Sequence, residues 1–125
     1  MNRTLIIGLV LISVSFVGLG AQERMNLGNL VQRGDIYLMP ETLVPYSGPA
    51  FSLFPSDSTR IREQGTLRGG TWEGLYESFY FNGQVDSKIE YRDGEFDGLF
   101  ERYYFDGQLL ARGSYNMGVR CGEWI

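Results

Sequence analysis

The chain contains no histidine and a single cysteine, Cys121. Without an imidazole group, the commonest general base, the usual Ser and Cys catalytic triads and imidazole metal sites are excluded. One cysteine cannot form an internal disulfide, so we expect Cys121 to be either a free thiol or a link to a second chain. We therefore expect no catalytic residues, no cofactor and no metal site, and a disulfide-linked dimer stays open.

Positive charge is also scarce. The chain has 11 Lys and Arg residues against 15 Asp and Glu residues, and its formal net charge is −4 at pH 7. Clustered Lys and Arg supply most of the non-specific affinity for nucleic acid, and they attract anionic surfaces. We therefore expect neither nucleic acid nor anionic lipid to be a partner of the folded part.

The densest group of carboxylates is Asp93-Gly94-Glu95-Phe96-Asp97-Gly98. Its alternation resembles the start of a calcium-binding loop, but such a loop requires a bidentate Glu at its twelfth position, and Tyr104 stands there. We expect a solvated turn between two hairpins instead. Nothing in the spacing selects a pair of carboxylates for glycoside cleavage, so the sequence predicts a protein that is not an enzyme.

What the sequence does contain is an internal repeat. Two units of 24 residues follow one another from Gly74 to Gly122. The matching positions are Gly74, Gly98 and Gly122; Tyr80 and Tyr104; Phe81 and Phe105; Gly83 and Gly107; Gln84 and Gln108; Tyr91 and Tyr115; Gly94 and Gly118. A fixed period of this length is typical of a stacked-repeat fold, in which each unit buries its apolar face against its neighbours.

Each unit is expected to be a β-hairpin. Asn82-Gly83 and Asp106-Gly107 stand between runs rich in Tyr, Phe, Val and Leu, and these dipeptides favour a two-residue type I′ turn. Such a turn places Glu77 opposite Lys88 and Glu101 opposite Arg112. The predicted fold is therefore all-β, a single-layer meander of stacked antiparallel β-hairpins with an ion pair in each of these two units.

The predicted register divides the side chains between two faces. The inner face carries Tyr76, Tyr80, Val85, Ile89, Tyr91, Phe100, Tyr104, Leu109 and Tyr115. The opposite face carries the ion pairs together with Phe79, Phe81, Tyr103 and Phe105, which we expect to stack in a column. If nothing covers these four rings, they form an exposed patch for a partner. The alternative is that residues 36–54 or a curl of the sheet bury them as core.

The N-terminus has a different composition from the rest. Arg3 precedes an apolar run from Leu5 to Leu19, which is shorter than the roughly 20 residues of a membrane-spanning helix. Small residues before Ala21 suit a signal peptidase, so we expect a helical, cleaved signal peptide over residues 1–21 and an exported protein. An uncleaved membrane anchor is the alternative.

The remaining chain is expected to form one domain. Residues 22–34 are interpreted as a linker or a short helix, and residues 35–125 as the repeat domain. Its expected parts are units at about 48–73, 74–97 and 98–121, and a partial cap at 122–125. The first unit is atypical because its turn is two residues longer, as is common for terminal repeats.

The two units resemble the variant MORN repeats of the bacterial YwqK family. The resemblance lies in the regularly repeated glycines, in the aromatic residue before each Asn-Gly or Asp-Gly turn, and in the Tyr three residues before the next Gly. The resemblance covers roughly residues 35–124. It implies a MORN-like stack of hairpins and, from the family's designation as toxin–antitoxin system antitoxins, a partner toxin. Repeats, export and missing catalytic groups favour a non-enzymatic protein-binding or scaffold module at the cell envelope. The alternative is an antitoxin-like protein that neutralises its toxin by direct binding.

Overall fold

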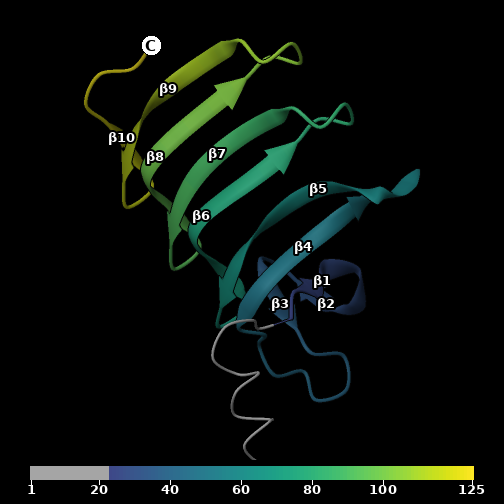
Figure 1. The fold of residues 1–125 in the computed structure, drawn as a ribbon. Coiled ribbons are helices and arrows are strands. Elements are labelled where there is room, and N and C mark those ends of the chain that lie inside the picture. Colours follow the sequence, from purple (N-terminus) through teal and green to yellow (C-terminus); the bar gives the residue numbers. More distant parts are fainter. Residues whose placement is uncertain (1–22) are drawn as a thin grey trace, which may run out of the picture.

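The computed structural model describes residues 23–125, which fold as an all-β protein. Eight strands form one sheet in the order β1-β4-β5-β6-β7-β8-β9-β10. They are β1 (Met25–Asn26), β4 (Gly48–Phe54), β5 (Asp57–Arg68), β6 (Thr71–Phe79), β7 (Val85–Arg92), β8 (Glu95–Tyr103), β9 (Leu109–Asn116) and β10 (Val119–Cys121). From β4 to β10 each strand pairs antiparallel with its sequence neighbour, so the hairpins stack in chain order (Figure 1). The prediction of a meander of antiparallel hairpins is confirmed, whereas the expected signal helix lies outside the described residues.

The turns at the hairpin tips have three residues instead of the predicted two. The amide of Tyr80 donates to the carbonyl of Gln84, and the amide of Gly83 donates back to Tyr80, at 2.8 and 2.9 Å. Only Gly83 has a positive φ, of 89°, whereas Asn82 does not. This is a type I turn followed by a left-handed glycine, so the prediction of a type I′ turn here was wrong. The tip at Asp106-Gly107 repeats the same bonds.

The predicted strand register is nevertheless correct over the middle of each hairpin. Beside the tips it was wrong, because Val85 pairs with Phe79 and Leu109 with Tyr103, so both lie on the opposite face instead of the predicted inner face. Glu77 lies opposite Lys88, and Glu101 lies opposite Arg112. A bulge at Asp86, and another at Leu110, adds one residue to the returning strand and cancels the extra residue in the turn.

Only one of the two expected ion pairs forms. Glu101 binds Arg112 at 2.6 Å. Among the residues that the structure describes, no salt bridge joins Glu77 to Lys88, and Glu77 instead accepts a hydrogen bond from Gln64.

The type I′ turns lie at the opposite edge, between one hairpin and the next. Asp93 and Gly94 have φ values of 50° and 83°, and Met117 and Gly118 have 48° and 84°. Gly94 donates to the carbonyl of Trp72, and Gly118 donates to that of Phe96, so each turn is bonded to the strand that begins after the preceding turn. The repeat glycines Gly74, Gly98 and Gly122 also have positive φ, and their role is therefore to shape the backbone.

Residues 25–33 differ from the predicted linker. They form β1, which runs parallel to β4, a single 3-10 turn η1 (Leu27–Asn29), and β2 (Val31–Arg33), which pairs with β3 (Ile36–Leu38) in a second sheet. The Asn26 side chain caps this turn by accepting from the amide of Gly28 at 2.9 Å. Burial of Leu27 against the first hairpin holds the segment in place.

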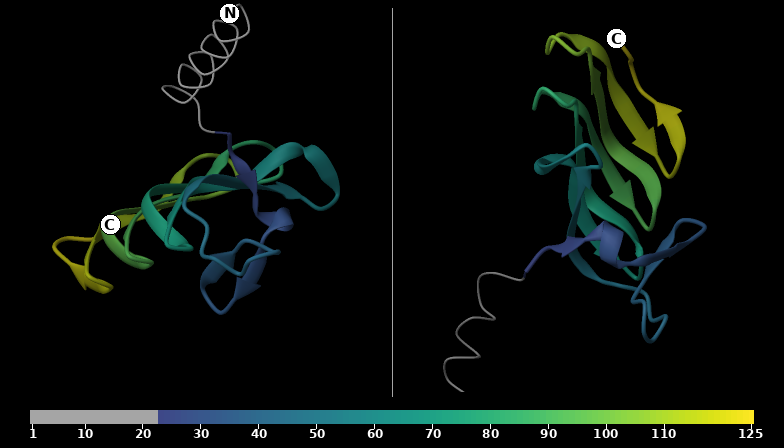
Figure 2. Two further views of the ribbon diagram at one scale, coloured as in Figure 1. Left: turned by 90° about the horizontal axis from the view of Figure 1, so that it is seen from below. Right: turned by 90° about the vertical axis from the view of Figure 1, so that its right-hand side faces the viewer.

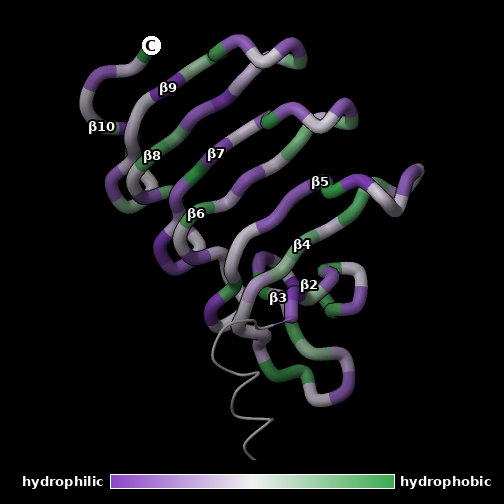
Figure 3. Tube along the Cα trace, viewed as in Figure 1, coloured by the Kyte–Doolittle hydropathy of each residue, from purple (hydrophilic) through white to green (hydrophobic). Residues whose placement is uncertain are grey.

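Among the described residues the hydrophobic core is small and lies mainly at the first hairpin, with Ile89 of β7 buried farther along the sheet. Leu27, Ala50 and Leu67 are buried at the first hairpin, with Leu30, Tyr37, Tyr46 and Trp72 packed around them. Residues 23–47, here called the N-terminal segment, lie against one face at this end of the sheet (Figure 2). The later hairpins continue as a single layer. Apolar and polar residues alternate along many of the strands (Figure 3). Within residues 23–125, no helix has the length and apolar character needed to cross a membrane.

Candidate partner-binding site

A row of aromatic side chains, here called the inner stripe, crosses the face of the sheet against which the N-terminal segment packs. Its members are Trp72, Tyr76, Tyr91, Phe96, Phe100, Tyr115 and Trp124. Neighbouring rings lie 5.0–5.6 Å apart between centroids, mostly edge to face. Such pairs stabilise each other beyond their buried area.

Glycines let the two tryptophans lie close on the sheet. A Cβ atom at Gly65 would come 2.9 Å from the ring of Trp72, and one at Gly113 would overlap the ring of Trp124. The absence of a side chain at both glycines therefore lets a large ring pack directly on the backbone at each end of the stripe.

The N-terminal segment covers only one end of the stripe. The ring of Tyr37 contacts Trp72 with centroids 6.3 Å apart, and Trp72 packs against the buried core. Tyr37 and Asp35 of this segment also line a hollow beside Tyr91 and Phe96. Phe100, Tyr115 and Trp124 lie farther along the sheet and are partly exposed. The N-terminal segment thus lies beside the stripe from Trp72 to Phe96, and the rings of the last hairpin, Phe100 and Tyr115, lie beyond it.

Tyr76 and Tyr91 of the stripe remain neutral across the physiological range. Burial raises the pKa of Tyr76, and the carboxylate of Glu63, which accepts its hydroxyl at 2.8 Å, raises it further. Burial and the charge of Glu63 also raise the pKa of Tyr91. Because neither hydroxyl ionises near neutral pH, this part of the face stays apolar with hydrogen-bonding tips, as at many interfaces.

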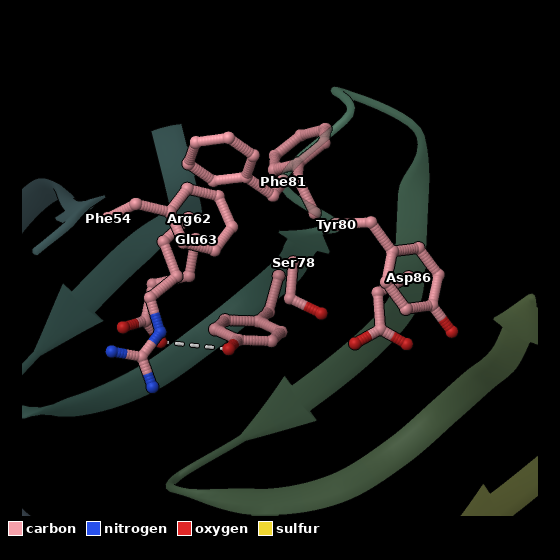
Figure 4. Close-up of a pocket in the computed structure, with 9 residues that line it drawn as sticks. Phe54, Arg62, Glu63, Ser78, Tyr80, Phe81 and Asp86 are labelled. Carbon is pink, nitrogen blue, oxygen red and sulfur yellow. Dashed lines mark hydrogen bonds between the residues drawn. The ribbon is translucent and has the colours of Figure 1, made fainter. Parts of the chain in front are cut away.

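A polar hollow of about 410 Å³ adjoins the stripe toward the hairpin tips. Figure 4 shows Arg62 and Glu63 on one side of it and Tyr80 and Asp86 on the other, with Ser78 between them. Glu63 accepts from Ser52 at 2.7 Å as well as from Tyr76, and Asp86 pairs with Arg102 at 3.3 Å. These carboxylates are held by neighbouring donors, so they supply fixed acceptors beside the stripe.

The four rings predicted to form the binding patch do not form one column. Phe81 packs on Phe54 of the preceding hairpin with centroids 5.2 Å apart, and Phe105 packs on Tyr80 in the same way at 5.8 Å. Phe79 and Tyr103 lie half-buried in the strands, and the Tyr103 hydroxyl donates to Glu101. The bulges and the three-residue turns direct Phe81 and Phe105 along the tips.

The predicted turn residues also join neighbouring tips. The Asn82 amide donates to the carbonyl of Phe105 at 3.1 Å, and the Tyr80 hydroxyl donates to that of Tyr103 at 2.7 Å. Asp106 caps its own turn by accepting from the amide of Gln108. Phe81 and Phe105 keep 46% and 61% of their surface exposed, so their role in binding a partner stays a prediction.

Trp72 and Phe96 belong to the stripe but were missed from the sequence. The signal was available, because they are 24 residues apart and so occupy equivalent positions in successive units. The contact of Trp72 with Tyr37 could not be found from the period, because Tyr37 precedes the predicted units.

A family model described as a MORN repeat variant matches residues 72–93 and 96–117. These two segments carry MORN repeats. They coincide with the β6–β7 and β8–β9 hairpins, and each match begins at a ring of the inner stripe. Comparison with curated proteins finds no match, and neither does comparison with solved structures. MORN repeats suggest a protein-binding or scaffold module; membership of the YwqK family stays a prediction.

Proposed function

We propose that this protein is an exported, non-enzymatic module that binds a protein of the cell envelope on its inner stripe. The observation that carries the proposal is the incomplete cover of the stripe. Trp72 is packed beneath the N-terminal segment, whereas Phe100 and Tyr115, on the same face, lie beyond that segment. They pack beside other rings of the stripe and the buried Ile89, and they stay partly exposed. Contiguous aromatic surface with a polar rim is typical of protein interfaces, where Tyr and Trp provide much of the affinity.

The edge-to-face packing of the rings favours a protein over a flat ring-shaped ligand. Interplanar angles of 61° and 89° relate Tyr115 to Phe100 and to Trp124. Rings packed edge to face direct their faces at one another's edges, whereas stacking of a planar ligand needs an open ring face.

The non-enzymatic part of the proposal is supported by the residues available. The chain has no histidine, and the carboxylates of the polar hollow accept hydrogen bonds from neighbouring side chains. Export is supported by the composition of residues 1–21.

The test compares the same substitution on the two faces of neighbouring strands. Tyr115→Ser removes a ring of the inner stripe on β9, and Tyr103→Ser removes a ring of the opposite face on β8. Each variant, carrying an affinity tag, is incubated with solubilised envelope proteins, and its thermal unfolding is recorded. We expect Tyr115→Ser to lose a partner that Tyr103→Ser retains, with both variants folded. Retention by Tyr115→Ser and loss by Tyr103→Ser would contradict the proposal.

A narrower form of the proposal identifies the partner as a toxin. It is supported by the resemblance to the YwqK family, and it predicts that the product of a neighbouring gene is toxic alone and harmless when expressed with this protein. Co-expression with Tyr115→Ser should restore the toxicity. A neighbouring gene product without toxicity would contradict the identification of the partner as a toxin, but not the broader proposal of a protein-binding module.

A further inference from the structure

A second hollow, of about 260 Å³, lies where the N-terminal segment meets the inner stripe. We call it the Trp72 pocket. Rings from four strands line it, namely Tyr37 of β3, Trp72 of β6, Tyr91 of β7 and Phe96 of β8. Gln32 and Asp35, from the β2–β3 hairpin, complete its rim. The pocket therefore combines an aromatic lining with one carboxylate.

The rings of the Trp72 pocket are inclined steeply to one another. Tyr37 and Trp72 meet at 64°, and Tyr91 and Phe96 meet at 65°. Steeply inclined rings surround a hollow from several directions, and each ring face carries partial negative charge that attracts a cation. This is the arrangement by which proteins enclose an organic cation.

The carboxylate at the rim lacks a positive partner. Asp35 is exposed, and among residues 23–125 it takes part in no salt bridge, whereas Asp57, Asp86, Asp93 and Asp97 each pair with an arginine. The formal net charge of the chain is −4, so a cationic group is attracted to the molecule as a whole as well as to this rim.

The chain itself shows that rings of this sheet accept a guanidinium. Arg24 lies over Phe51 at 4.9 Å from the ring centroid, and Arg60 lies over Phe81 at 4.6 Å. Arg120 lies over Trp124 at 4.1 Å, at the far end of the inner stripe. In every case the cation is a guanidinium, whose planar shape stacks on a ring while its N–H groups remain free for a carboxylate.

We propose that the Trp72 pocket receives an arginine side chain of the protein partner. The guanidinium packs against the rings and pairs with Asp35, while the rest of the partner covers the stripe beyond Phe96. The inference rests on the proposed function, because it names a side chain by which the same partner docks.

The pocket is tested with a small probe, the blocked tripeptide acetyl-Ala-Arg-Ala-amide, followed by the indole N–H signal of Trp72 in NMR spectra. Trp124, the other tryptophan, already has Arg120 over its ring and serves as the internal control. We expect a saturable shift at Trp72 only. The matched peptide carries citrulline, which has nearly the shape of arginine without its charge, and should bind at least about tenfold more weakly.

A pair of variants tests the carboxylate. Asp35→Asn should weaken binding of the arginine peptide by roughly three- to tenfold, as expected for a partly exposed ion pair. Asp106→Asn, at an exposed hairpin tip far along the chain, should leave it unchanged. Equal binding of the arginine and citrulline peptides, a shift at Trp124 alone, or identical affinities for wild type and Asp35→Asn would each overturn the inference.

The outcome is separable from that of the proposed function. If a partner is captured through Tyr115 but Trp72 does not respond to the arginine peptide, the inference about the Trp72 pocket is overturned and the proposed binding on the inner stripe still holds. A saturable, Asp35-dependent response supports the pocket whether or not envelope extracts yield a partner.

Discussion

Glu101 is a buried charged residue in a sheet that has little core. Its exposure is 9%, and it accepts hydrogen bonds from the Tyr103 hydroxyl at 2.8 Å and from Arg112 at 2.6 Å. Burial acts to raise the pKa of Glu101, but the two hydrogen bonds and the charges of Arg112 and Lys88 outweigh it, so the pKa is lowered. The carboxylate is therefore retained in its charged form as part of the fold.

Replacing Glu101 should destabilise the protein more than replacing its counterpart one repeat earlier. We expect Glu101→Gln to lower the free energy of unfolding by about 1–3 kcal/mol, because it removes charge-assisted hydrogen bonds at a buried site. Glu77→Gln should cost no more than about 0.5 kcal/mol, since no salt bridge joins Glu77 to Lys88 among the described residues. Urea unfolding of both variants makes the measurement.

The pH dependence follows from the direction of the shift. A lowered pKa in the folded state means that Glu101 stabilises the fold above the ordinary value of 4.5, and that this contribution is lost as pH falls through the folded value. The stability difference between wild type and Glu101→Gln should therefore shrink in acid. Equal costs for Glu101→Gln and Glu77→Gln at neutral pH would contradict this account.

Asp57 organises the loop of the first hairpin. Its carboxylate accepts from the Thr59 hydroxyl at 2.6 Å, from the Thr59 amide at 2.9 Å and from Arg60 at 2.9 Å. These bonds, chiefly the one from the Thr59 hydroxyl, lower the pKa of Asp57 to about 2. The loop should keep its order above pH 3.8 and lose it as pH falls through about 2.

Carboxyl NMR titration measures this value directly. We expect a pKa of about 2 for Asp57 in the wild type. Thr59→Val, which removes the hydroxyl donor and keeps the side-chain shape, should shift the pKa upward toward 3.8. A wild-type value already near 3.8 would show that the hydrogen bonds are absent in solution.

At the scale of elements, one turn adds to the contacts that β1 and Leu27 make between the N-terminal segment and the sheet. The amide of Tyr37 donates to the carbonyl of Gly70, and the amide of Gly70 donates to that of Tyr46, both at 2.9 Å. Gly70 has a φ of 85°, and a Cβ atom there would lie 2.6 Å from the Ile36 side chain and 2.8 Å from the Tyr37 carbonyl. Gly74 has a similar φ of 79° but open space around it.

Comparison of Gly70→Ala with Gly74→Ala therefore separates two effects. Both variants strain the backbone, but only the added Cβ at position 70 clashes with neighbouring atoms. Both should pay about 1–2 kcal/mol for an L residue in the left-handed region. Gly70→Ala should cost more, and by displacing the N-terminal segment it should shift the fluorescence of Trp72 toward that of an exposed indole. Equal stability and unchanged fluorescence in the two variants would mean that the segment is not held through Gly70.

The strands could be predicted from the sequence because the bulges and the three-residue turns do not change the period of 24 residues or the side-chain alternation in the middle of the strands. The pairing of Glu77 with Lys88 was predicted from a two-residue turn and is correct only because the bulge at Asp86 offsets a three-residue turn. Sequence alone does not reveal such a bulge, since Asp86 corresponds to Leu110 in the next unit and shares no residue type with it.

The candidate site was predictable only in part for the same reason. Most of the inner face followed from the register, whereas the tips depend on turn geometry. Val85 and Leu109 were therefore assigned to the wrong face, and Phe81 and Phe105 to the wrong neighbours. The position of the N-terminal segment could not be predicted, because Leu27 and Tyr37 contact residues distant in sequence and stand outside the repeat.

At the scale of the whole molecule, stability and binding are distributed along one layer of hairpins. Each hairpin contacts its neighbours, and the buried cluster of Leu27, Ala50 and Leu67 closes one end. A repeat protein of this kind gains stability from each interface between neighbours. Whatever covers the open part of the inner stripe should therefore stabilise the later hairpins.

Export of the protein is tested by the mass of its mature form. Removal of a signal peptide should leave a chain that begins near Ala21 or Gln22. Intact-mass spectrometry of the protein purified from the envelope or medium gives the answer. A mass corresponding to all 125 residues would instead indicate that residues 1–21 are retained.

The central claim, that a partner docks on the inner stripe, is tested most directly by photo-crosslinking from defined positions. Benzoylphenylalanine, itself an aromatic side chain, replaces Tyr115 on the inner stripe, Tyr103 on the opposite face, or Phe105 at a hairpin tip. Each protein is expressed in its native envelope and irradiated, and adducts are compared by mass. We predict a discrete protein adduct from position 115 and none from position 103. An adduct formed only from positions 103 or 105 would contradict the account and favour the patch predicted from the sequence.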